Sequence, residues 1–131
     1  MPCYIIYTGD DKMIIGIAGS RSITADIPDG LITENVTLIY SGGAAGIDMS
    51  ARRYATERHI LITEVLPEYD LYGRAAPLRR NDWIIKLCDK IYVFWDGKSR
   101  GSNYVIKECR KLGKPYTVYL WKNGEFIKQE N

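Results

Sequence analysis

Continuous apolar runs, separated by polar stretches, dominate the hydrophobic pattern of this chain. Each run is short and rich in isoleucine, valine, tyrosine and phenylalanine, without strict apolar–polar alternation. Runs of this kind are typical of parallel strands that are covered on both faces, because a strand with one solvent-exposed face carries a polar residue at every second position. The pattern predicts strands at residues 13–18, 36–40, 60–66, 90–95 and 115–120.

Helical spacing marks the segments between these runs. After Gly46 an apolar face recurs at Ile47, Ala51, Tyr54 and Ala55, which predicts a helix that ends near residue 58. Residues 102–112 predict another helix, capped by a glycine, and a short helix is expected over residues 31–35.

A further helix is expected at residues 82–89, with Trp83, Ile84, Leu87 and Cys88 toward the core. The preceding residues, 67–81, are interpreted as a long loop rich in tyrosine and arginine. Near the C-terminus the Asn-Gly pair at residues 123–124 predicts a type I′ hairpin turn.

This order of elements indicates an α/β, Rossmann-like fold. We expect a mostly parallel, doubly wound sheet of about five strands with helices on both faces and a small C-terminal hairpin. Residues 13–131 are expected to form one domain, and residues 1–12 an N-terminal extension or an edge strand.

Composition and charge narrow the function classes. The net charge of +2 is too small to indicate nucleic acid without a local basic patch. Three cysteines without a CxxC pair, and a single histidine, predict reduced thiols and no metal site, and no cofactor is indicated. No apolar run reaches the ~18 residues of a membrane span, so a cytoplasmic location without membrane contact is expected.

Small, hydroxyl-bearing and cationic residues gather where the predicted strands end. In an open α/β sheet the carboxyl ends of the strands form the ligand crevice, and a glycine turn that opens a helix offers free N–H groups to an anion. Arginine pairs with phosphate and tyrosine stacks on bases, so the expected ligand is a nucleotide or a nucleotide-derived molecule. The expected binding residues are Gly19, Ser20, Arg21, Ser41, Gly42, Gly43, Ala44, Gly46, Asp48, Tyr69, Tyr72, Gly73, Arg74, Arg80, Asn81, Gly101 and Ser102.

Four motifs follow one another along the chain: Gly19-Ser20-Arg21, Ser41-Gly42-Gly43-Ala44-Ala45-Gly46-Ile47-Asp48, Tyr72-Gly73-Arg74-Ala75-Ala76 with Arg80-Asn81, and Arg100-Gly101-Ser102. In this order they resemble the SLOG superfamily, which is related to the Smf/DprA and LOG proteins, and its YspA-like branch. The resemblance covers roughly residues 13–120 and implies a Rossmann-like domain that binds nucleotides or their derivatives, with dimerisation through a helical face. Val105 stands where the LOG hydrolases carry a catalytic glutamate, and Ala45 where the YspA-like branch has an arginine.

Two alternatives to ligand binding stay open at this point. One is an N-glycosidic hydrolase or transferase acting on a nucleotide, for which Asp48 and Asp96 are the candidate catalytic residues and Glu64 a third carboxylate. The other is binding of single-stranded DNA in the manner of DprA, which requires a basic patch. Its candidate cations are Arg21, Arg52, Arg53, Arg74, Arg79, Arg80, Lys98 and Arg100.

Overall fold

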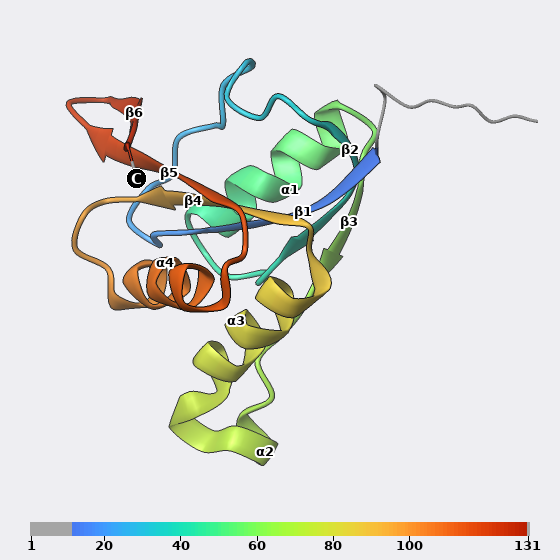
Figure 1. Ribbon diagram of the computed structural model, residues 1–131, viewed down its shortest axis with the longest axis vertical. Helices are drawn as coiled ribbons and strands as arrows, with labels where there is room; N and C mark the ends of the chain where they lie inside the picture. Colours follow the sequence, from blue (N-terminus) through green and yellow to red (C-terminus); the bar gives the residue numbers. More distant parts are fainter. Residues whose placement is uncertain (1–11, 131) are drawn as a thin grey trace, which may run out of the picture.

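The computed structural model describes residues 12–130 and shows an α/β fold built on one six-stranded sheet (Figure 1). The strand order is β3-β2-β1-β4-β5-β6. All neighbours pair in parallel except β5 and β6, which are antiparallel. The expected Rossmann-like, mostly parallel sheet with a C-terminal hairpin is therefore confirmed.

Each predicted apolar run forms a strand, although the strands differ in how far they are covered. In β4 the four central residues are all buried. The strands are β1 (Lys12–Gly19), β2 (Asn35–Ser41), β3 (Leu61–Glu64), β4 (Lys90–Trp95), β5 (Tyr116–Lys122) and β6 (Glu125–Lys128). The prediction of an extension or edge strand over residues 1–12 lies, apart from Lys12, outside the described residues.

One face of the sheet is covered by α1 (Ile47–Glu57) and by the connection between β1 and β2. That connection contains no helix, so the expected short helix at residues 31–35 is wrong. Its isoleucines Ile23, Ile27 and Ile32 are buried in the same core as Ile47 and Ala51 of α1. A crossover between parallel strands usually covers the sheet with a helix. Here the three buried isoleucines of the connection cover it instead.

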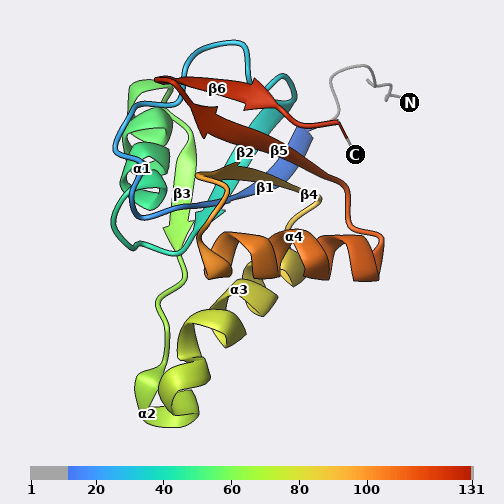
Figure 2. The same ribbon diagram turned by 90° about the vertical axis from the view of Figure 1, so that its left-hand side faces the viewer.

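The other face is covered by α3 (Ala76–Leu87) and α4 (Arg100–Leu112), which confirms helices on both faces (Figure 2). In α3 the core positions are Ile84 and Ile85, followed by Cys88 just past the helix end. Trp83 and Leu87, which were expected in the core, are 48% and 43% exposed. Residues 84 and 88 are four positions apart and lie on the side of the helix that packs against the sheet, so residues 83 and 87 lie beside that face.

Residues 67–81 are largely helical, so their interpretation as a loop is wrong. They contain α2 (Tyr69–Tyr72), the 3-10 turn η2 (Gly73–Ala75) and the first residues of α3. Pro77 lies in the first turn of α3, where a missing N–H removes no intrahelical hydrogen bond. Pro77 was therefore expected in a loop but belongs to the first turn of α3. The helix begins at Ala76, six positions before the expected residue 82.

The chain reverses its direction across the sheet between β1 and β4. From β1 it builds outward through β2 and β3, and from β4 it builds the opposite way through β5. At such a switch point the loops that follow the two strands diverge and leave a crevice at their carboxyl ends. None of the helices in residues 12–130 is long and apolar enough to cross a membrane.

Candidate functional site

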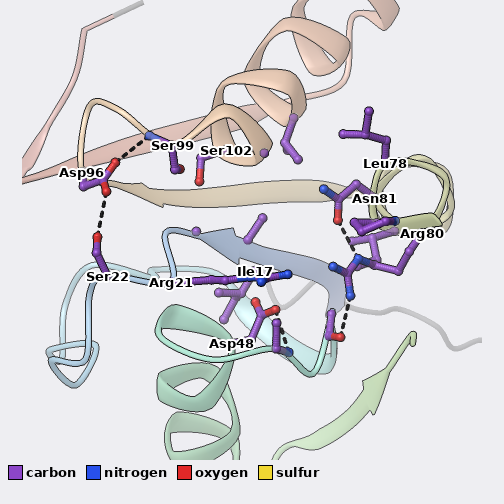
Figure 3. Close-up of a pocket in the computed structure, with 18 residues that line it drawn as sticks. Ile17, Arg21, Ser22, Asp48, Leu78, Arg80, Asn81, Asp96, Ser99 and Ser102 are labelled. Carbon is purple, nitrogen blue, oxygen red and sulfur yellow. Dashed lines mark hydrogen bonds between the residues drawn. The ribbon is translucent and has the colours of Figure 1, made fainter. Parts of the chain in front are cut away.

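A cavity of about 530 Å3 lies at this switch point (Figure 3). Its walls come from the ends of β1 and β2, the loop after β4, and the N-terminal parts of α1, α3 and α4. The lining residues are Ile17, Ala18, Gly19, Arg21, Ser22, Gly42, Ala44, Asp48, Pro77, Leu78, Arg80, Asn81, Ile84, Asp96, Ser99, Gly101, Ser102 and Val105.

The glycine turn between β2 and α1 forms one wall and is closed by Asp48. The Ala44 N–H donates to Asp48 Oδ2 at 3.0 Å, so the carboxylate in the first turn of α1 fixes the glycine turn that precedes the helix. Burial raises the pKa of Asp48 against the opposing effects of the Ala44 amide, Arg80 and the nearby Ser41 hydroxyl. Ser41 Oγ is itself buried and lies outside hydrogen-bond geometry with any described residue.

Gly46 sets the distance between this turn and the loop after β1. Its backbone adopts φ 73° and ψ −126°, a conformation that favours glycine. A Cβ atom at Gly46 would lie 2.5 Å from Arg21 Cα, Arg21 O and Ser20 O. The contact is tight because the Ile47 N–H donates to Ser20 O at 3.2 Å. A glycine is therefore required for the two loops to meet at the cavity.

Arg80 reaches from α3 to the glycine turn and is buried. Its Nη1 donates to Gly42 O at 2.6 Å and to Val65 O at 3.3 Å, and its Nε donates to Asn81 Oδ1 at 2.8 Å. Burial lowers the pKa of Arg80, an effect that Asp48 opposes and Arg21 reinforces. The guanidinium thus ties three segments together, and it also adds a positive charge to the cavity wall.

Arg21 extends from the loop after β1 into the cavity, between Asp48 and Arg80 (Figure 3). It is close enough to act on both neighbours: its charge lowers the pKa of Asp48 and that of Arg80. No hydrogen bond or ion pair within the described residues holds its guanidinium. The lining holds two arginines and two carboxylates, Asp48 and Asp96, and among these four the Arg21 guanidinium is the charged group left free to pair with an anion.

The N-terminus of α4 faces the cavity from the opposite side. The first amides of a helix have no partner inside the helix and carry a partial positive charge. Here Gly101 and Ser102 belong to that first turn and line the cavity. The Ser102 hydroxyl is buried, makes no hydrogen bond with any described residue, and points into the cavity (Figure 3). A buried polar group without a partner costs about 1–3 kcal/mol, which a bound acceptor would recover.

Asp96 organises the loop between β4 and α4. Its Oδ1 accepts from the N–H groups of Lys98 and Ser99, both at 2.8 Å, and its Oδ2 accepts from Ser22 Oγ at 2.7 Å. Partial burial alone raises the pKa of Asp96, but these hydrogen bonds outweigh it and bring the pKa to about 2. An ionised carboxylate with both oxygens occupied acts as a loop anchor and is poorly suited to proton transfer.

The structure brings together many of the predicted binding residues and leaves others outside the cavity. Ser20, Ser41, Gly43 and Gly46 lie in the strand end and loops that form its walls but do not line it. Tyr69, Tyr72, Gly73 and Arg74 are exposed on α2 and η2 and do not line it. Those inside are Gly19, Arg21, Gly42, Ala44, Asp48, Arg80, Asn81, Gly101 and Ser102.

Two hydroxyl residues of the cavity, Ser22 and Ser99, were missed by the sequence reasoning. Both are held by Asp96, and Ser99 also shares a hydrogen bond of 3.0 Å with Ser20 Oγ. Ser99 directly precedes α4, and a serine at the start of a helix is a recognisable N-terminal residue. No local sequence pattern marks Ser22 as a site residue, because its contact with Asp96 joins segments 74 positions apart.

Comparisons with known proteins found no match of this chain to a family model, a curated protein or a solved structure.

Proposed function

We propose that the cavity binds a nucleotide or a nucleotide-derived molecule through its phosphate group. The observation that carries this proposal is the buried, unpartnered Ser102 hydroxyl, which stands at the N-terminus of α4 and lines the same cavity as the free guanidinium of Arg21. A hydroxyl donor, helix amides and an arginine are the groups that phosphate recruits in proteins.

The size and the apolar part of the cavity support a ligand that is larger than phosphate. Its volume of about 530 Å3 falls within the ~300–1,000 Å3 of small-molecule sites. Ile17, Leu78 and Val105 give it apolar walls, which suit the flat face of a base or the carbons of a sugar. Tyr69 and Tyr72, expected to stack on a base, are outside the cavity, so this role passes to aliphatic side chains.

Cleavage of an N-glycosidic bond is a second candidate, supported by one observation. Asp48 is a buried carboxyl group in the wall of the cavity, and its pKa is raised by that burial. In such a reaction water replaces the base at the sugar carbon, and a carboxylate activates the water or attacks the carbon. The opposite wall offers no partner, because Val105 is apolar and Asp96 is fully hydrogen-bonded. Binding without turnover is therefore the better-supported function.

Binding of single-stranded DNA is less well supported, because many of the candidate cations are already neutralised. Arg52 makes two hydrogen bonds to Glu64, at 2.8 and 2.6 Å. Arg53 pairs with Asp26 at 2.6 Å and Arg79 with Asp82 at 3.1 Å. Of the candidate cations that remain, Arg21 and Arg80 line one cavity, an arrangement that suits a small anion better than an extended strand.

A ligand screen on the purified protein tests the proposal. Nucleoside mono-, di- and triphosphates, dinucleotides, ADP-ribose and short single-stranded DNA are added during thermal unfolding. A ligand at ~100 times its dissociation constant adds about 2.7 kcal/mol of apparent stability, which raises Tm by several degrees. We expect a shift for one class of small nucleotides, lost in Arg21→Ala and kept in Arg110→Ala, which changes an exposed arginine at the far end of α4.

The outcomes of the screen are distinct. A ligand that shifts Tm equally in Arg21→Ala and in the wild type does not bind in this cavity. A shift by DNA alone supports the DprA-like alternative. Release of free base, abolished in Asp48→Asn, supports N-glycosidic cleavage, and no shift by any member of the library contradicts nucleotide binding.

A further inference from the structure

The segment of residues 66–75, here called the arm, projects away from the sheet. Figures 1 and 2 show α2 at the far end of the molecule in both views. Its main contacts are with η2 and α3, and neither α2 nor η2 contains a buried residue. Its large apolar side chains face outward: Leu66 is 63% exposed, Tyr69 56%, Leu71 66% and Tyr72 38%.

This exposure is not explained by the cavity or by the core. None of the four side chains lines the cavity or belongs to either core cluster. A helix as short as α2 does not hold its shape in water without tertiary packing, because nucleating the first turn is unfavourable. Clustered apolar side chains on an otherwise polar surface mark a site of protein–protein contact.

The charges of the arm indicate what would cover it. Acidic Glu68 and Asp70 lie at its start and basic Arg74 at its end. Within residues 12–130 none of the three forms an ion pair, although Asp70 and Arg74 are four positions apart. A surface with acid at one end, apolar side chains between, and base at the other end complements a copy of itself turned through a half-rotation.

We propose that the arm is the contact surface between two copies of this chain, packed antiparallel about a two-fold axis. In that arrangement Asp70 of each copy faces Arg74 of the other, and the leucines and tyrosines meet at the axis. The proposal does not rest on the proposed function, because none of the arm side chains that carry it lines the cavity. The arm leads directly into α3, so contact between arms also steadies the helix that carries Arg80 and Asn81.

The size of the arm sets the expected strength of the dimer. The arm provides fewer residues than the ~20–30 per side of a standard interface. We therefore expect a dissociation constant on the order of 10 µM, so that dilution separates the copies.

Sedimentation velocity from about 1 to 100 µM tests the proposal directly. The wild type is expected to change from monomer to dimer over this range, and Leu71→Asp to weaken the dimer roughly tenfold or more, because it places a charge among the apolar side chains. Leu112→Asp is the matched control, since Leu112 is 62% exposed on α4, outside the arm. Thermal unfolding of both variants checks that they keep the fold.

Charge reversal then tests the antiparallel pairing. Asp70→Arg and Arg74→Asp, each alone, place like charges opposite each other and should weaken the dimer, whereas the double variant should restore it. A mixture of the two single variants should form mixed dimers in preference to either homodimer, as native mass spectrometry can count. A wild type that stays monomeric at about 100 µM, or a dimer that Leu71→Asp leaves intact, overturns the proposal and assigns the arm to another partner. Failure of the double variant to restore the dimer overturns the antiparallel arrangement.

Discussion

Two glycines with nearly the same backbone conformation allow the close approach at the cavity to be measured by itself. Gly46 adopts φ 73° and ψ −126°, and Gly73 adopts φ 56° and ψ −130°. Their surroundings differ: a Cβ at Gly46 would lie 2.5 Å from three backbone atoms of residues 20 and 21, whereas nothing lies within 4 Å of one at Gly73. Gly46→Ala and Gly73→Ala therefore share the backbone strain and differ in the steric overlap.

The magnitudes follow from these distances. An alanine in this region of φ and ψ costs about 1–3 kcal/mol at either position. At Gly46 the overlap with fixed backbone adds about 1–3 kcal/mol, because the loop after β1 must move as a unit. We expect Gly46→Ala to lower the free energy of unfolding by about 2–6 kcal/mol and Gly73→Ala by about 1–3 kcal/mol or less, since the arm can relax. One kcal/mol corresponds to roughly 3–5 °C in Tm for a chain of this length.

Urea unfolding of both variants and the wild type, at a protein concentration below the expected dimer dissociation constant, measures the difference. Equal losses of stability in the two variants would refute the reasoning, because the close contact at Gly46 would then carry no energy. Gly46→Ala should also weaken ligand binding, since its Cβ would displace the backbone that carries Arg21.

Three further changes separate the roles of single side chains. Ser102→Ala should leave the free energy of unfolding unchanged or raise it by up to ~1 kcal/mol, while ligand affinity falls roughly fivefold. Ser50→Ala removes a hydrogen bond of 2.6 Å to Ala25 O and should instead lower the free energy of unfolding by about 0.5–1.5 kcal/mol. Urea unfolding of the two variants measures this difference. Arg80→Lys should lower the free energy of unfolding by about 1–3 kcal/mol, because lysine cannot reproduce the hydrogen bonds to Gly42, Val65 and Asn81. Arg79→Lys, which changes the exposed neighbour, should alter the free energy of unfolding by no more than about 0.5 kcal/mol. Equal effects of the two variants would contradict the role of Arg80 in joining these segments. The pKa of Asp96 lies at about 2, below its ordinary value of 3.8, so its contribution to stability is present above about pH 4 and is lost as pH falls through about 2. Asp96→Asn should therefore be less stable than the wild type at pH 7 and lose less stability than it between about pH 4 and 2, and parallel acid-unfolding curves would contradict this.

Local patterns in the sequence were sufficient for the strands, the fold class and much of the cavity. Apolar runs identify the parallel strands because a strand that is covered on both faces, such as β4, carries apolar side chains at successive positions. Residues at strand ends then fall on one edge of the sheet by topology, and this is why Gly42, Asp48 and Ser102 were expected at one site and line one cavity.

The tertiary structure decided what depends on contacts distant in sequence. Arg79 and Arg80 look alike in the sequence, yet Arg80 is buried and Arg79 is exposed, because α3 begins at Ala76 and its phase places residues 80, 84 and 88 toward the sheet. Ser22 and Asp96 meet across 74 positions, and the Ser102 hydroxyl lacks a partner only because of what the fold brings around it. Tyr69 and Tyr72, which local chemistry assigned to the ligand, lie exposed on α2 and do not line the cavity. The sequence by itself determined which residue types stand at the strand ends, and the packing of helices on the sheet determined which of them face the cavity, because side-chain direction depends on helix phase and on pairing between distant segments.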